Sequence, residues 1–130
     1  MRIFKTDSKT NFVDINDVLV GLDAYQSCCE SFGHFFIKEI PEQPLHKVYD
    51  SWTDEASSKD DYSPTNLEDL VFDPDFFQEQ PDGDGGGFAI FRLHSGDDES
   101  FLVLYNHHNG YYGHGFTVTH KGTDLRDGCL

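Results

Sequence analysis

The C-terminal part of the chain holds three apolar runs separated by turn signals, and this pattern restricts the fold more than any other feature. The runs cover residues 88–94, 101–107 and 111–120. Residues 96–99 separate the first two runs, and an Asn-Gly pair at 109–110 separates the last two. Apolar runs joined by short glycine-containing turns are typical of antiparallel strands. We therefore expect a three-stranded antiparallel meander.

A two-residue turn at the Asn-Gly pair would fix the pairing of the last two strands. Because side chains alternate between the faces of a sheet, one face would carry an aromatic and aliphatic stripe: Phe101, Val103, Tyr105, His107, Tyr112, His114, Phe116 and Val118. Leu102, Leu104 and Thr117 would lie on the other face. His107 and His114 would then be diagonal neighbours on one face, roughly 7 Å apart between backbones.

Residues 12–27 fit two structures. Apolar residues at helical spacing behind an Asn16 cap favour a helix. The alternation of Val18, Val20 and Leu22 in a β-branched run favours a strand instead. Periodicity alone leaves both readings open.

The rest of the chain divides into short elements and acidic excursions. Residues 35–40 alternate and end before a proline, which indicates a strand, and residues 64–70 are typical of a capped helical turn. Acidic, polar and glycine-rich residues at 41–63 and 73–87 predict long loops. The sequence thus predicts an α+β, mostly β fold in one domain, 1–130: an antiparallel sheet with a C-terminal three-stranded meander, one or two short helices and long acidic loops.

Cysteine usage and the apolar profile restrict the compartment. Three cysteines, two of them adjacent, do not suggest a disulfide framework. The N-terminal residues lack the apolar run of a signal peptide, and no stretch is long enough for a membrane span. We expect a cytoplasmic protein with reduced thiols.

Charge is the strongest global signal. The formal net charge is −15, and residues 50–99 hold fifteen acids against Lys59 and Arg92. Such a surface repels nucleic acid and anionic membranes and attracts basic proteins. We therefore expect a basic protein partner, with no direct binding of nucleic acid and no membrane association. The candidate partner-binding residues are carboxylates with nearby aromatic anchors: Asp54, Glu55, Asp60, Asp61, Asp73, Asp75, Trp52 and Phe76. The competing interpretation is a solvated acidic surface.

The histidines and cysteines suggest a second kind of site. His107 and His114 could share a metal with Cys28 and Glu30. No metal-binding motif supports this, so histidines that hydrogen-bond tyrosines at the sheet rim remain the favoured interpretation, with no cofactor. No nucleophile with an orienting base, carboxylate pair or cofactor fingerprint is evident, and we expect no enzyme activity.

Several short motifs resemble a family of small proteins of unknown function found in phages, prophages and bacterial genomes. The motifs are the Cys-Cys-Glu segment at 28–30, Leu-Glu-Asp-Leu at 67–70 and Asn-Gly-Tyr-Tyr at 109–112. The resemblance covers residues 18–118 and implies a compact α+β or mostly β domain with Cys-Cys-Glu at a strand end. It therefore favours the strand reading of residues 18–25, and it implies no activity.

Together these patterns favour a non-enzymatic acidic interaction protein of phage or mobile-element origin. It would bind a basic, nucleic-acid-handling host protein, with inhibition as one outcome, because spaced carboxylates imitate a phosphate backbone. The alternative is a small-ligand or metal-binding domain centred on His107, His114 and the Cys28–Glu30 segment.

Overall fold

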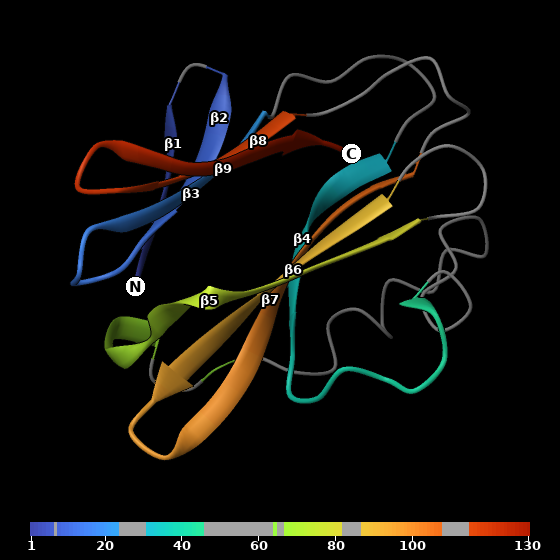
Figure 1. Cartoon of the computed structure of the whole chain (residues 1–130), viewed down its shortest axis with the longest axis horizontal. Helices are drawn as coiled ribbons and strands as arrows, with labels where there is room; N and C mark the ends of the chain where they lie inside the picture. The colour runs from blue at the N-terminus through green and yellow to red at the C-terminus, as the bar shows by residue number, and fades with distance from the viewer. Residues whose placement is uncertain (7, 24–30, 46–63, 65–66, 82–86, 108–114) are drawn as a thin grey trace.

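The chain forms two antiparallel β-sheets that pack on each other (Figure 1). The computed structural model describes residues 1–6, 8–23, 31–45, 64, 67–81, 87–107 and 115–130. The five-stranded sheet has the order β1-β2-β3-β8-β9, and the four-stranded sheet has the order β4-β7-β6-β5. The described chain is therefore mostly β.

The strand bounds show how the sheets are assembled. The five-stranded sheet contains β1 (Arg2–Thr6), β2 (Lys9–Val13), β3 (Val18–Asp23), β8 (Gly115–His120) and β9 (Thr123–Cys129). The four-stranded sheet contains β4 (Ser31–Ile37), β5 (Val71–Pro81), β6 (Gly87–Ser95) and β7 (Asp98–His107). A short 3-10 helix, η1 (Leu67–Asp69), precedes β5. None of the described residues belongs to a helix long and apolar enough to cross a membrane.

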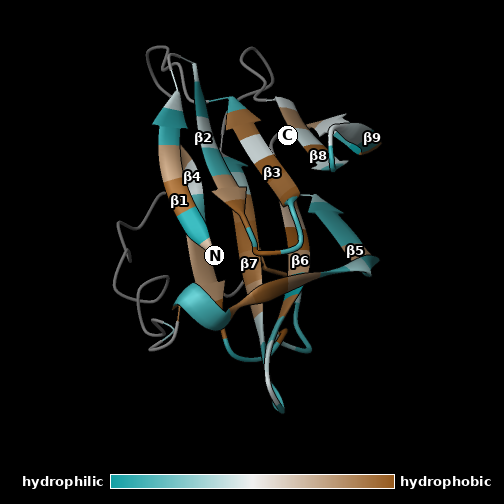
Figure 2. Ribbon diagram, turned by 90° about the vertical axis from the view of Figure 1, so that its left-hand side faces the viewer, coloured by the Kyte–Doolittle hydropathy of each residue, from teal (hydrophilic) through white to brown (hydrophobic). Residues whose placement is uncertain are grey.

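The main core lies between the sheets. Side chains from both sheets meet there, and the largest of the fully buried ones are Phe12, Val20, Leu22, Phe116, Leu93, Leu102 and Leu104. The hydropathy colouring of Figure 2 shows brown segments on β3, β6 and β7. Gly128 on β9 is essential to this packing, because a Cβ there would lie only 2.6 Å from the Phe116 ring.

A second cluster covers the other face of the four-stranded sheet. It contains Phe35, Ile37, Leu45, Phe88, Ile90, Phe101 and Val103. The Leu45 amide donates to the side-chain oxygen of Gln80 at 2.8 Å, which fixes the segment after β4 against β5. A sheet buried on both faces requires near-continuous apolar strands, and the buried run at residues 87–91 of β6 satisfies this requirement.

Several sequence predictions are confirmed. Residues 18–23 form a strand, so the strand reading is correct over that stretch. Residues 88–94 and 101–107 form the predicted hairpin, with Ser95 paired to Asp98. The helical turn predicted at 64–70 is present as η1, the one helical element whose bounds the structure describes. A single short 3-10 helix does not establish the α+β classification.

The prediction for the third strand of the meander is wrong. The strand β7 pairs with β4 on one side and β6 on the other, so it has no free edge for β8. β8 instead pairs with β3 and β9 in the opposite sheet. As a result, Phe116 packs with Leu102 and Leu104 in the main core rather than beside Phe101. The Asn-Gly turn at 109–110 lies outside the described residues.

The predicted loop at 73–87 is also wrong over residues 73–81. These residues belong to β5, an edge strand whose pairing with β6 is interrupted between Phe72 and Phe77. Proline and acidic residues are tolerated on an edge strand and at a bulge, where ladder hydrogen bonds are missing. Pro74 and the acids beside it occupy this irregular segment.

Asp14 connects the two sheets. Its side chain is buried, and one carboxylate oxygen accepts the amides of Asn16 and Val18 at 2.9 Å each. The other oxygen accepts the amide of Phe72 in β5 at 2.8 Å. The first two bonds close the β2–β3 turn, and the third links that turn to the edge of the opposite sheet. We call this arrangement the Asp14 clamp.

The clamp predicts a large stability loss for Asp14→Ala. The substitution leaves three amides without their acceptor, two of them in buried hydrogen bonds, and we expect a cost on the order of 3 kcal/mol in the free energy of unfolding. Urea denaturation measures this cost. The control is Asp17→Asn, an exposed change in the same turn that should stay within about 0.5 kcal/mol of the original protein. Equal effects of the two substitutions would contradict the clamp.

Candidate functional site

The predicted partner-binding residues are only partly within the described chain. Trp52, Asp54, Glu55, Asp60 and Asp61 lie outside the described residues. The other three, Asp73, Asp75 and Phe76, lie together in the irregular segment of β5.

Asp73 is engaged within the protein. The Nε and Nη2 atoms of Arg92 both donate to one carboxylate oxygen of Asp73, with Nε at 3.0 Å. His94 Nε2 lies 3.4 Å from the same oxygen, and the Asp75 amide donates to the other at 3.0 Å. The hydrogen bond from Arg92 is the main reason that the pKa of Asp73 is lowered. This carboxylate therefore holds the β5 bulge against β6.

Phe76 is also part of the packing. Its ring lies 5.6 Å from the Phe101 ring, and the Arg92 guanidinium lies over it at 4.9 Å. Phe76 is half-buried in the second cluster. Of the three described candidates, only Asp75 is exposed to solvent.

The β6–β7 turn provides acidic residues that the candidate set missed. Gly96 has a φ of 61°, which the first central position of a tight hairpin turn requires. Asp97, Asp98 and Glu99 follow and are all exposed. The Lys38 ammonium lies 4.0 Å from Asp98, whose side chain is still 85% exposed. We call Asp97, Asp98 and Glu99 the acidic turn; their exposure and position after a turn glycine were readable from the sequence.

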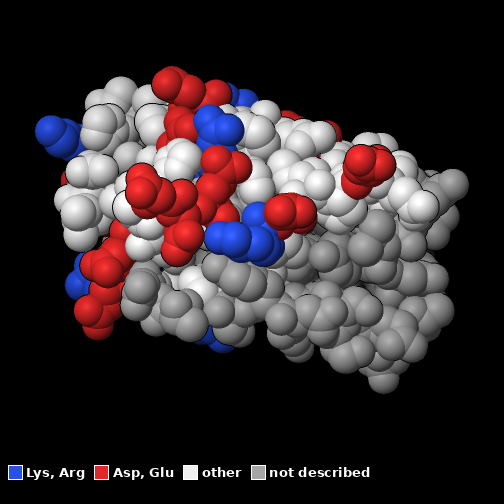
Figure 3. Space-filling model, turned by 90° about the horizontal axis from the view of Figure 1, so that it is seen from below, with Lys and Arg blue, Asp and Glu red and all other residues white. Residues whose placement is uncertain are grey.

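Figure 3 shows the end of the molecule on which this turn lies. Acidic side chains outnumber basic ones on the described part of that face. Besides Lys38, Arg92 is a cation close enough to interact with this group: its pKa is raised chiefly by the hydrogen bond to Asp73, with smaller contributions from the charges of Asp73, Glu99 and Asp75. The charge of Arg92 is thus already largely balanced by Asp73.

The strand pairing from which the histidine and cysteine site was predicted is not formed. Cys28, Glu30 and His114 lie outside the described residues. His107 is the last residue of β7 and pairs with Ser31 of β4, so the β7–β8 pairing from which a contact with His114 was predicted is wrong. Within the described ranges, no group of three or more His, Cys, Asp or Glu residues is placed to hold a metal ion.

His34 has a structural environment. Its ring lies edge-on to Phe12 at 4.8 Å and to Phe36 at 5.9 Å. Desolvation, followed by the charge of Lys5, lowers the pKa of His34. The neutral imidazole is therefore favoured at neutral pH, which suits a ring contact.

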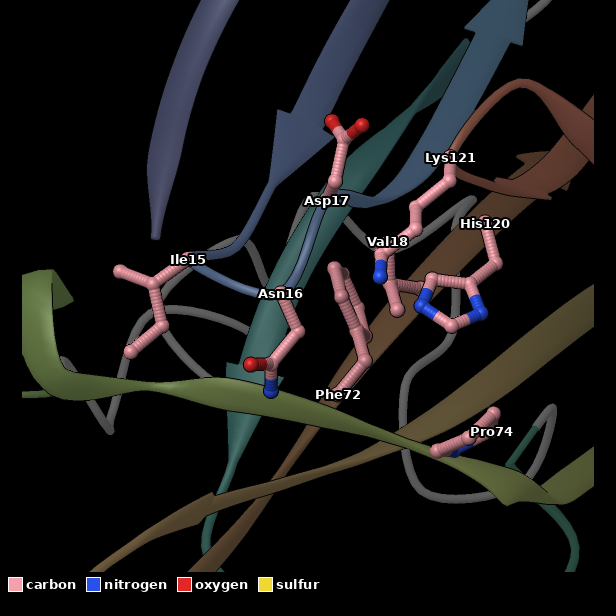
Figure 4. A pocket seen from close by; sticks show the side chains of 8 residues that line it. All are labelled: Ile15, Asn16, Asp17, Val18, Phe72, Pro74, His120 and Lys121. Atoms are coloured by element: carbon pink, nitrogen blue, oxygen red, sulfur yellow. The ribbon is translucent and has the colours of Figure 1, made fainter.

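Two adjoining hollows lie where β5 faces the five-stranded sheet. The first has a volume of about 620 Å³ and is bordered by the β2–β3 and β8–β9 turns and by β5. Figure 4 shows the Asp17 carboxylate directed away from this hollow and the His120 ring turned toward it. The second, of about 240 Å³, reaches between the sheets. Val18, Phe72 and Pro74 line both hollows.

The second hollow, which we call the edge cleft, has an apolar floor and charged rims. Its floor includes Val20, Phe77, Phe91 and Val118, and its rims carry Asp73, Asp75 and Arg126. Sequence reasoning missed it because its walls come from five strands that are distant in the chain. The polar run 123–129 also gave no sign of being a strand.

Comparisons of the chain with protein-family models, with curated proteins and with solved structures found no match. The functional argument therefore depends on the geometry of the acidic turn and the edge cleft.

The Arg92–Asp73 contact predicts a pH-dependent contribution to stability. Because the folded-state pKa of Asp73 lies below the ordinary 3.8, this contribution is complete above that value and is lost as the pH falls through the lowered pKa. We expect Asp73→Asn to be less stable than the original protein at pH 7, and the gap to narrow as the pH falls to about 2. Urea denaturation across this range measures the gap.

The control for this prediction is Asp98→Asn. That exposed ion pair with Lys38 should contribute less than about 1 kcal/mol. A gap for Asp73→Asn that stays constant with pH would show that the carboxylate charge does not matter.

Proposed function

We propose that this chain is a non-enzymatic acidic binding protein whose acidic turn contacts a basic surface of another protein. The observation that supports this most directly is that Asp97, Asp98 and Glu99 are exposed while the neighbouring cation Arg92 is engaged by Asp73. Lys38 lies 4.0 Å from Asp98 but leaves that side chain 85% exposed, so all three carboxylates remain accessible to a partner's lysines and arginines.

The hairpin presents these carboxylates on a firm support. β6 and β7 pair continuously from Gly87 with Asn106 to Ser95 with Asp98. Both strands are buried on their two faces over much of their length. A preorganised charged surface loses less side-chain and loop freedom on binding, so the turn suits electrostatic recognition.

The proposed partner is a nucleic-acid-handling protein. Closely spaced carboxylates can occupy a site that evolved for phosphates, and complementary charge raises the association rate. Inhibition of the partner would follow from occupying that site. A cytoplasmic location and a phage or mobile-element origin belong to the same proposal, supported by the motifs at 28–30 and 109–112.

The test uses two variants with equal changes in charge. Asp97→Asn, Asp98→Asn and Glu99→Gln together neutralise the acidic turn, and Asp17→Asn, Asp124→Asn and Asp127→Asn remove three exposed charges from the other sheet. The original protein and both variants are immobilised and exposed to bacterial lysate, and bound proteins are eluted with rising salt and identified by mass spectrometry.

We expect the original protein and the second variant to retain the same nucleic-acid-handling protein, released at moderate salt because screening weakens exposed charge contacts. The acidic-turn variant should lose it. An equal loss of capture in both variants would mean that only net charge matters. Undiminished capture by both variants, or capture of no specific protein by the original chain, would contradict the proposal.

A further inference from the structure

The edge cleft lies between β5 and β9, which are edge strands of different sheets. Its volume is about 240 Å³, below the roughly 300–1,000 Å³ of sites for drug-sized ligands. Val20, Phe91 and Val118 are buried core residues that also line it. The cleft is therefore an opening into the core that suits a small apolar group.

Both rims depart from regular strand geometry. The pairing of β5 with β6 is interrupted between Phe72 and Phe77. On β9, Val118 pairs with Arg126 and Thr119 pairs with Asp124, so Leu125 has no partner across the ladder. Bulges re-aim side chains and are frequent beside functional sites. Here the β9 bulge brings both Leu125 and Arg126 to the cleft.

Arg126 is placed to bind an anion. Its guanidinium lies over the Phe77 ring at 4.0 Å. The ion pairs of the described residues are formed by Lys9, Lys38, Arg92 and His94, and none involves Arg126. A guanidinium has donors that match a carboxylate in a two-point contact. Among the described residues, Arg126 is thus an exposed arginine with no carboxylate in ion-pair contact, although the chain has a net charge of −15.

Charged groups lie on both sides of the cleft. On the side of Arg126, the adjoining hollow is lined by His120, by Lys121 of the β8–β9 turn and by Asp17, whose carboxylate points away from it. On the β5 side, Asp73 is held by Arg92, and Asp75 is the remaining carboxylate. A ligand anion would therefore lie toward β9, with its apolar part between the sheets.

We propose that the edge cleft binds a small monocarboxylate with an aromatic or branched aliphatic body. Arg126 holds the carboxylate, and Val20, Phe91 and Val118 contact the apolar part. This site is separate from the acidic turn, so its test does not depend on the proposed partner.

The test is titration of the purified chain with 3-phenylpropanoate, followed by methyl and amide NMR. We expect shifts at Val18, Val20, Val118 and Leu125. Arg126→Gln should weaken binding about tenfold or more, because a hydrogen-bonded charge pair is lost. The matched control is Arg2→Gln on β1, the opposite edge strand of the same sheet. Arg2 also has its guanidinium over a ring, that of Phe4, at 5.4 Å. Binding of 3-phenylpropanoate to this variant should be unchanged.

Phenethylamine, which has a similar body and the opposite charge, serves as the second probe. We expect it to bind at least tenfold more weakly than the acid. Shifts outside the cleft, no shifts at all, equal affinity for the amine, or an Arg126→Gln variant that binds normally would each overturn the proposal. Arg126 is exposed, and circular dichroism of the variant confirms that its fold is retained.

Discussion

The hydrogen bonds to the carboxylate of Asp14 are the constraint on which the arrangement of the two sheets at this edge depends. One oxygen closes the β2–β3 turn, and the other takes the amide of Phe72 on the opposite sheet. The amides of Val18 and Phe72 form the two buried hydrogen bonds of this set. Both residues also line both hollows. The same carboxylate that stabilises the turn therefore holds two residues that line the edge cleft, one from each sheet.

The irregular part of β5 separates structural acids from available ones. Asp73 turns toward Arg92 and holds the bulge against β6, whereas Asp75 is exposed. Charged residues and Pro74 on this strand also protect an edge that could otherwise pair with another chain. Net charge alone does not distinguish these roles; the hydrogen bonds do. The acidic turn then presents carboxylates that no described cation neutralises fully.

The sequence predicted local structure better than pairing between distant segments. Gly96 and the alternation around it identified the β6–β7 hairpin, because a tight turn and its strands are adjacent in the chain. The sheet membership of β8 was not predictable, since alternation at 115–120 does not reveal that its partner is β3. β5 was mistaken for a loop because its proline and acids are typical of loops, and only the free edge of the sheet makes them acceptable.

The same limit applies to the sites. Asp14 and Asn16 have the composition of a polar turn, but the contact from Asp14 to Phe72 spans 58 positions and leaves no local signal. Arg126 lies in a polar run whose glycine is explained only by the Phe116 ring above it. Exposed turn acids, in contrast, could be recognised from Gly96 alone.

Native-state hydrogen exchange of the Phe72 amide tests the account most directly. Phe72 lies on an edge strand, where amides that point away from the sheet have no ladder partner and exchange readily. If Asp14 joins the sheets and holds these two residues as described, the Phe72 amide exchanges as slowly as the Val18 amide, and both lose protection together in Asp14→Ala. A Phe72 amide that exchanges as fast as exposed loop amides in the original protein would contradict the account.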